Sequence, residues 1–313
     1  MTSHYTPLEQ EALLHIAGPD TLTFLQGQLT CDTRNIDAEH ALPGAFCTPQ
    51  GRVVCDFLLC QLANEHFALR LRRDIRPGSA ATFGKYIVFS KAELDAERDD
   101  WQIIACWGED VAAALESVFG TVPREHFGAR AGEGFVVVQT DREGWQFECY
   151  VKTPDRAQLL NELGDALQPS SEAAWQALQI SSGIGRVQAP TSGEFIPQML
   201  NYDLTGHVSF NKGCYTGQEV VARMHYRGKP KRRMYLAELP DAGNAPAGTA
   251  LYSSAGQQSV GNIVNSASVD SGPAIALVVA TADGVQNGLH LEAPDGPPLR
   301  VRELPYSLEP DPE

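Results

Sequence analysis

The character of the sequence changes near residues 228–240, and this change constrains the fold more than any other feature. Upstream, helix and strand patterns mix without the regular strand–helix alternation of a parallel sheet, which favours an α+β fold with antiparallel sheets. Downstream, as far as Pro305, the helical patterns disappear and short runs rich in Gly, Pro, Ser and Val alternate. Short strands separated by turn residues indicate a small β-barrel or sandwich. We therefore expect an α+β region over residues 1–228 and a β-barrel domain over residues 229–313.

The helices and strands of the upstream region can be placed one by one. In the run 66–72, Phe67, Leu69 and Leu71 alternate with polar neighbours, the period of a half-buried strand. Asp20 is a candidate N-cap, and Pro77-Gly78 is expected to break the chain before a helix that runs to Lys85. The other predicted strands are 52–62, 101–107, 134–140 and 145–152, and the other predicted helices are 111–119, 171–181, 217–226 and one from Pro154 to about Leu163 with Thr153 as its N-cap.

The distribution of charge points to an anionic ligand. The chain has 24 basic and 39 acidic residues, a net charge of −15, and such a surface repels nucleic acid unless its positive charge is concentrated. Six bases and no acid fall between residues 223 and 233: Arg223, Arg227, Lys229, Lys231, Arg232 and Arg233. One cationic cluster on an acidic protein suggests a small or extended anion as ligand. The alternative is a solvated strand end beside a loop.

Cysteine usage and hydropathy favour a cytoplasmic protein. The seven cysteines are an odd number and show no CxxC spacing, which argues against a disulfide framework and against a cysteine-rich metal site. No window approaches eighteen consecutive apolar residues, and the N-terminus has no basic segment followed by an apolar one. Histidine pairs with metal-ligand spacing and glycine-rich nucleotide loops are also missing from the sequence. We expect reduced thiols, no membrane association and no bound metal.

Cys214 lies in a setting that favours a reactive thiol. The run Thr216-Gly-Gln-Glu219 fits a capping box, which would start a helix that Gly228 ends. A sulfur two residues before a helix N-terminus, with Lys212 nearby, is held more readily as thiolate. The alternative is a buried, inert cysteine under a helix. The other six cysteines occur in apolar or strand contexts and are predicted to be core residues.

A long and specific pattern surrounds this cysteine. Gly-Glu-Phe-Ile-Pro-Gln198 is followed by Val-Ser-Phe-Asn-Lys-Gly-Cys-Tyr-Thr-Gly-Gln-Glu-Val-Val-Ala-Arg223. Three shorter pieces accompany it in order: Phe-Leu-Gln-Gly-Gln28, Lys-Tyr-Ile-Val-Phe-Ser-Lys91 and Leu-Pro-Tyr-Ser-Leu308. Over nearly its whole length the chain resembles the YgfZ family. The residues that match its signature motif are Lys212, Gly213, Cys214, Tyr215, Gly217, Gln218, Glu219 and Arg223.

The resemblance implies a fold, a cofactor and a cellular role. The family is built like the T-protein (aminomethyltransferase) of the glycine cleavage system, with two interlaced α+β lobes and a C-terminal β-barrel around a central cavity that accepts tetrahydrofolate. Its members support assembly or repair of iron–sulfur clusters in a subset of enzymes, including radical enzymes that methylthiolate tRNA. We therefore expect a monomer whose partners are folate and iron–sulfur enzymes or assembly proteins, with no direct binding of nucleic acid.

Some of the family's folate-binding residues can be transferred to this chain and others cannot. Trp175 matches a tryptophan implicated in folate binding, and its indole offers a flat face to a pterin or aminobenzoyl ring; a core role on a helix is the alternative. Glu11 stands where the family has a second aromatic contact. Ser181 stands where related sequences have a glutamate, which puts the geometry of pterin binding in doubt.

Further candidate folate contacts are Gln26, Gln198, Arg223 and Arg227. Glutamine amides can both donate and accept hydrogen bonds, and the arginine fork suits the carboxylates of a polyglutamate tail. Two other functions stay open: a true folate-dependent aminomethyltransferase, and an interaction module in which Cys214 serves only the fold. The sequence favours the folate-binding accessory protein, because T-proteins lack this cysteine motif and no counterpart of their catalytic acidic pair is found.

Overall fold

The computed structural model describes residues 2–152, 154, 156–240, 245–268 and 272–308. The chain forms two compact units that interleave along the sequence. Unit 1 contains Met1–Gly44, Asp56–Glu172 and Asn211–Cys214, and unit 2 contains Ala45–Cys55, Ala173–Phe210 and Tyr215–Glu313. The division into domains at residue 228 stays a prediction.

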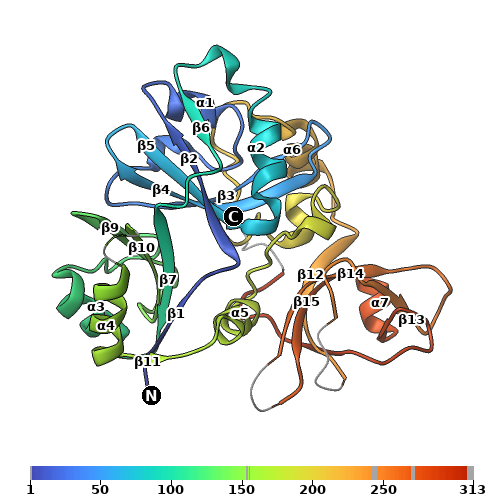
Figure 1. The fold of residues 1–313 in the computed structure, drawn as a ribbon. Helices are drawn as coiled ribbons and strands as arrows, with labels where there is room; N and C mark the ends of the chain where they lie inside the picture. Colours follow the sequence, from blue (N-terminus) through green and yellow to red (C-terminus); the bar gives the residue numbers. More distant parts are fainter. Residues whose placement is uncertain (1, 153, 155, 241–244, 269–271, 309–313) are drawn as a thin grey trace. The chain divides into compact units, whose positions relative to one another are not determined.

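Unit 1 contains a six-stranded sheet with two helices packed on one face (Figure 1). Its strands, in spatial order, are β11 (Gln168–Pro169), β1 (His4–Pro7), β7 (Trp101–Trp107), β10 (Gln146–Lys152), β9 (Phe135–Gln139) and β8 (Ala129–Gly132). Only β1 and β11 pair in parallel; the other neighbours are antiparallel. The helices are α3 (Val111–Phe119) and α4 (Arg156–Ala166). Ile104, Cys106 and Phe147 of the strands meet Leu115 and Leu163 of these helices in one apolar cluster.

The second sheet of unit 1 contains the N-terminal hairpins. Its strands, in spatial order, are β3 (Leu42–Cys47), β4 (Val53–Ala63), β5 (His66–Arg72), β2 (Glu11–Ala17) and β6 (Glu93–Asp95). The ends of β3 and β4 that adjoin their connecting turn belong to unit 2. Two helices accompany this sheet, α1 (Thr21–Gln26) and α2 (Arg76–Phe83), together with the short 3-10 turns η1 (Thr33–Asn35), η2 (Arg73–Ile75) and η3 (Ile87–Phe89).

A buried ion pair joins the two sheets of unit 1. Arg70 of β5 donates from Nε and Nη2 to the carboxylate of Glu148 on β10, at 2.9 and 2.8 Å. Tyr150 donates its hydroxyl hydrogen to the same carboxylate at 2.7 Å, and Glu11 of β2 lies 3.6 Å from Arg70 Nη1. All four residues are buried. Removal of one partner would leave the other charge buried and uncompensated, which is strongly destabilising. The ion pair therefore holds the two sheets together.

We predict that Glu148→Gln lowers the free energy of unfolding by about 3 kcal/mol, because Arg70 keeps its charge and loses its principal partner. Denaturant unfolding measures the change. Glu116→Gln is the matched control, since Glu116 pairs with Arg124 at 2.6 Å with both side chains more than half exposed, and its loss costs under about 1 kcal/mol. Equal and small losses in both variants contradict the prediction.

Unit 2 is built on a six-stranded antiparallel sheet that is buried on both faces. Its strands, in spatial order, are β16 (Leu289–Leu291), β13 (Ala250–Ser253), β14 (Gly261–Ala267), β15 (Ile275–Thr281), β12 (Arg232–Glu238) and β17 (Arg300–Arg302). Along β15, Leu277 and Val279 enter one apolar cluster and Val278 the other, as side chains that alternate across a strand must. The barrel expected at the C-terminus is thus present as a curled half-barrel sheet.

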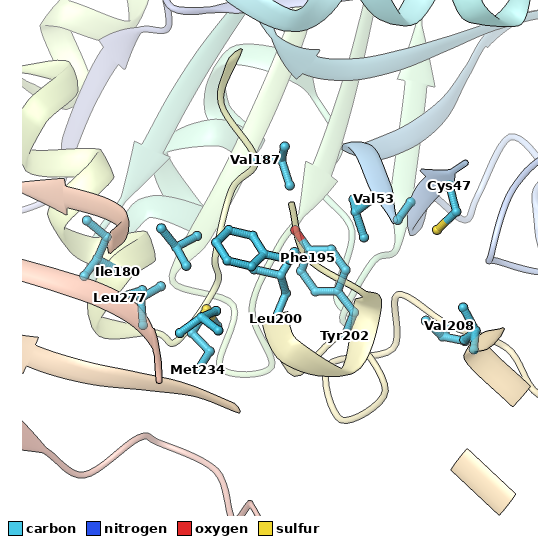
Figure 2. Packing of buried hydrophobic residues seen from close by; sticks show 14 of the residues in the cluster. Cys47, Val53, Ile180, Val187, Phe195, Leu200, Tyr202, Val208, Met234 and Leu277 are labelled. Atoms are coloured by element: carbon cyan, nitrogen blue, oxygen red, sulfur yellow. The ribbon is translucent and has the colours of Figure 1, made fainter. Parts of the chain in front are cut away.

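The first of these clusters also contains side chains from outside the sheet (Figure 2). They come from α5 (Glu172–Ser181), α6 (Gln218–Arg227) and the 3-10 turn η6 (Pro197–Leu200), and a further 3-10 turn, η5 (Ala189–Thr191), lies between α5 and η6 in the sequence. Ile180, Leu200 and Val221 are buried there together with Met234 of the sheet. Tyr202, also in the cluster, donates its hydroxyl hydrogen to the carbonyl oxygen of Gly185 at 2.8 Å.

Several local expectations were wrong in ways that have physical reasons. Asp20 precedes α1 without a side-chain cap, because its Oδ2 accepts the backbone N–H of Lys91 at 2.8 Å. Pro77 lies inside the first turn of α2, where its missing N–H costs nothing. A short helix, α7 (Ala282–Gln286), interrupts the all-strand C-terminal region and is capped by Thr281. Thr153, the expected cap of α4, lies outside the described residues. None of the described helices is long and apolar enough to span a membrane.

Candidate functional site

Lys212 fastens the segment that contains the cysteine motif to unit 1. Its Nζ donates to the carbonyl oxygens of Gln26, Leu29 and Cys31 at 2.9, 2.6 and 2.7 Å. An ammonium group has three hydrogens to donate, and three carbonyls converge on it. Burial lowers the pKa of Lys212 to about 8. Residues 211–214, which we call the cysteine loop, therefore group with unit 1 while both flanking segments belong to unit 2.

A second polar network orders the loop whose carbonyl oxygens accept hydrogen bonds from Lys212. Gln26 donates from Nε2 to Asp32 at 3.0 Å, and its Oε1 accepts the N–H and the hydroxyl of Thr33, both at 2.8 Å. Arg34 donates hydrogen bonds to the carboxylate of Asp32 from Nε at 2.9 Å and from Nη2 at 2.6 Å. These bonds lower the pKa of Asp32 below its ordinary value. The side-chain amide of Gln26, a predicted folate contact, is thus engaged within the protein.

We predict that Lys212→Met lowers the free energy of unfolding by about 3 kcal/mol, because the stem remains while three carbonyls lose their donor. Lys212→Arg gives little rescue, since a planar fork does not match three carbonyls around one point. Denaturant unfolding measures both. The control is Lys231→Met, whose side chain is exposed and whose loss leaves stability unchanged. Wild-type stability of Lys212→Met contradicts the assignment.

Cys214 differs from the other cysteines in exposure. It is exposed, whereas Cys31, Cys47, Cys55, Cys60, Cys106 and Cys149 are all buried, which confirms the prediction that these six belong to the core. Burial raises the pKa of Cys31 to about 12, so that thiol stays protonated. Of the seven thiols, Cys214 is therefore the one that a reagent or partner can reach.

Among the described residues no group of three or more His, Cys, Asp or Glu side chains could hold a metal.

The turn after Cys214 is formed by backbone geometry and not by the expected capping box. The N-cap of α6 is Gly217, with φ +84° and no side-chain cap. A Cβ at this position would collide with the carbonyl oxygen of Thr48, so the left-handed turn and the close approach both need glycine. Gln218 folds back and its Oε1 accepts the N–H of the buried Tyr215 at 3.1 Å. The expectation that Thr216 and Glu219 cap this helix was therefore wrong.

The basic cluster separates into exposed and engaged side chains. Arg223 and Arg227 lie one turn apart on α6, and both are exposed; within the described part of the chain neither forms an ion pair. Arg233 is engaged, because it donates from both Nη atoms to Asp203 at 2.6 and 2.9 Å and to the carbonyl oxygen of Gln198 at 2.9 Å. Lys229 and Lys231 of the cluster are exposed as well, so these lysines and the two α6 arginines are available to an anion, whereas Arg233 is not.

Trp175 and Gln198, two predicted folate contacts, are buried side chains of unit 2. Trp175 lies on α5 and is 4% exposed. Gln198 of η6 is 1% exposed and donates from Nε2 to the carbonyl oxygen of Val221 at 2.8 Å. Its Oε1 is buried and has no hydrogen-bond partner among the described residues. A buried acceptor of this kind costs free energy unless a donor satisfies it.

Two acidic residues that organise this region were not found from the sequence patterns. Asp32 accepts a hydrogen bond from Gln26, in the network that orders the loop bound by Lys212. Asp203 pairs with Arg233, so this arginine of the basic cluster is not available to a ligand. The spacing of Asp32 and Arg34, with one residue between them, is a local sign of such a pair. Asp203 and Arg233 lie thirty residues apart, and no local pattern joins them.

Comparison with known proteins identifies relatives of this chain. No protein-family model matches the sequence. The tRNA-modifying protein YgfZ of Klebsiella pneumoniae is 31% identical over 308 residues, which cover 96% of this chain and 92% of the relative. The protein of the same name from Cronobacter sakazakii is 32% identical over 309 residues, with coverage of 96% and 92%.

A solved structure shares the fold. It is the glycine cleavage system aminomethyltransferase T from Bartonella henselae, which superposes with a TM-score of 0.77 over 97% of this chain and 86% of its own. Its sequence identity of 16% shows a common fold and not a common activity. The expected T-protein-like α+β fold is thereby confirmed.

Proposed function

Because this chain belongs to the family of the tRNA-modifying protein YgfZ, we propose that it is a cytoplasmic, tetrahydrofolate-binding accessory protein. It supports the assembly or repair of iron–sulfur clusters in a subset of enzymes, and it affects tRNA indirectly through those that modify tRNA. The observation that carries the proposal is the exposure of Cys214, alone among seven cysteines, in a loop held in place by Lys212.

Side chains of unit 2 suit a folate. Trp175 supplies a flat aromatic face for a pterin or aminobenzoyl ring. The unpartnered Oε1 of Gln198 can accept a hydrogen bond from an N–H group of the ligand, which removes the cost of an unsatisfied buried acceptor. Arg223 and Arg227 pair with the carboxylates of the glutamate tail. Tetrahydrofolate, when bound, supplies a carrier for one-carbon units.

Cys214 provides the chemistry that binding alone does not. As a thiolate it is a nucleophile and a ligand for iron. Because iron–sulfur clusters take four ligands and the other six cysteines of this chain are buried, the remaining ligands come from a partner protein or from glutathione. Cys214 then acts as one transient contact during assembly or repair.

Calorimetry with tetrahydrofolate tests the binding part of the proposal. We predict that Trp175→Ala weakens binding about tenfold or more through loss of the stacking face, and that Cys214→Ala binds as wild type does. Because Trp175 is buried, Trp175→Phe is the second variant, and it keeps most of the affinity. In cells, Cys214→Ala abolishes the support of iron–sulfur enzymes while folate binding persists.

Two results contradict the proposal. Full cellular activity of both Cys214→Ala and Cys214→Ser identifies an interaction module in which this thiol has no chemical role. Robust turnover of an aminomethyl lipoyl carrier with tetrahydrofolate, or the reverse reaction of methylenetetrahydrofolate with reduced carrier and ammonia, identifies an aminomethyltransferase, the activity of the protein that shares the fold.

The basic cluster generates a separate prediction about the length of the glutamate tail. Neutralising Arg227 and Lys229 together, as Arg227→Gln with Lys229→Gln, weakens a polyglutamyl folate about tenfold and a monoglutamyl folate much less. The comparison uses calorimetry at one ionic strength. Arg142→Gln, which removes an exposed arginine of unit 1, leaves both affinities unchanged. An equal loss of affinity for the two folates would show that the glutamate tail does not bind to this cluster.

A further inference from the structure

The loop between α2 and β6, whose path can be followed in Figure 1, contains large apolar side chains that are exposed to solvent. Five large hydrophobic side chains are exposed in the described part of the chain, and three of them lie within four residues: Tyr86 at 39%, Val88 at 67% and Phe89 at 97%. Single exposed apolar side chains are ordinary, but a contiguous group marks a site of interaction. We call residues 85–91 the apolar loop.

Both ends of the apolar loop are tied down, so the exposure does not come from a loose segment. Before it, Phe83 is fully buried and meets Phe24 edge-on, with ring centroids 6.2 Å apart. After it, the N–H of Lys91 donates to Oδ2 of Asp20 at 2.8 Å, and the N–H of Asp20 donates to the carbonyl oxygen of Lys91 at 3.3 Å. A Cβ at Gly18 would collide with the carbonyl oxygen of Lys91, so the close contact between these two backbone segments requires glycine at position 18.

Hydrogen bonds also order the middle of the apolar loop. The N–H of Tyr86 donates to the carbonyl oxygen of Phe83, and the N–H of Ser90 to that of Ile87, each at 2.9 Å. The second of these bonds closes the 3-10 turn η3, from which Val88 and Phe89 project. A pre-ordered apolar surface binds a partner with less loss of conformational entropy than a flexible one.

The charge of the apolar loop is opposite to that of the protein. Lys85 and Lys91 flank the exposed residues, both are exposed, and the loop contains no acid, whereas the chain carries a net charge of −15. Neither lysine forms an ion pair with any described residue. At physiological ionic strength charges act over about 8 Å, so a ligand confined to this loop meets two positive charges.

We propose that the apolar loop docks a short, acidic segment of a partner protein, whose apolar side chains cover Val88 and Phe89 while its carboxylates pair with Lys85 and Lys91. An anionic membrane is a poorer partner, because an extended negative surface also meets the acidic remainder of this protein. A second copy of the chain brings a net charge of −15 and meets the same repulsion. The site is independent of the folate and cysteine chemistry proposed above.

Photocrosslinking of the full chain in cells identifies the partner. A photoreactive phenylalanine analogue at position 89 is expected to crosslink to a segment rich in Asp, Glu and apolar residues. The crosslink disappears when Lys85→Glu and Lys91→Glu are combined. Trp145, which is 48% exposed on the connection between β9 and β10, is the matched control position. Overturning results are a crosslink to a basic segment, to lipid or to a second copy, a crosslink that survives the charge reversal, or no excess over position 145.

Binding of a labelled synthetic peptide of alternating Glu and Leu, measured by fluorescence anisotropy, tests the chemistry. The peptide binds the wild type more weakly as salt is raised. Its affinity falls about tenfold in Phe89→Ser and in the double lysine variant, and it is unchanged in Trp145→Ser. Thermal unfolding confirms that the variants stay folded. Equal affinity in wild type and Phe89→Ser, equal binding of a Lys/Leu peptide, or preferential binding to phosphatidylglycerol vesicles overturns the proposal.

Discussion

The hydrogen bonds of Lys212 are the constraint on which the arrangement of the cysteine motif depends. One partly buried ammonium group donates hydrogen bonds to three backbone carbonyl oxygens at the end of α1 and in the loop after it. The network of Gln26, Asp32 and Arg34 orders that loop. Four residues of the chain are held in unit 1 by this contact. Lys212 is in this way a positioning residue: it places Cys214, and its own hydrogens are already committed to carbonyl oxygens.

The signature motif thus divides into residues that form the turn and residues that remain available. Gly217 permits a left-handed turn against Thr48, Gln218 binds the backbone of Tyr215, and Tyr215 is buried. Cys214 and Arg223 are exposed. A motif often joins both kinds of residue because chemistry on a loop requires a scaffold that holds the loop in one conformation. Its length in the sequence therefore overstates the number of residues that act on a ligand.

Local pattern predicted the elements well where the signal lies within the element itself. The alternation of Phe67, Leu69 and Leu71 marks β5, and Gly120 ends α3 in the left-handed conformation expected of a C-terminal glycine. The N-caps of helices were predicted less well, because a short polar side chain can also form a hydrogen bond with a residue far away in the sequence. Asp20 binds Lys91 in place of its own helix. In the basic cluster, Arg233 is withdrawn by Asp203, whose position relative to it depends on the folded chain.

The sequence by itself determined the α+β character, a C-terminal region built of short strands, the membership of a family, and the core placement of six cysteines, because periodicity, composition and a contiguous motif are properties of neighbouring residues. Only the tertiary structure decided that Lys212 bonds three carbonyls, that Arg70 and Glu148 join two sheets across 78 residues, and that Phe89 lies in solvent. Hydrogen bonds and burial act between atoms that are close in space, and the chain brings such atoms together only when it folds.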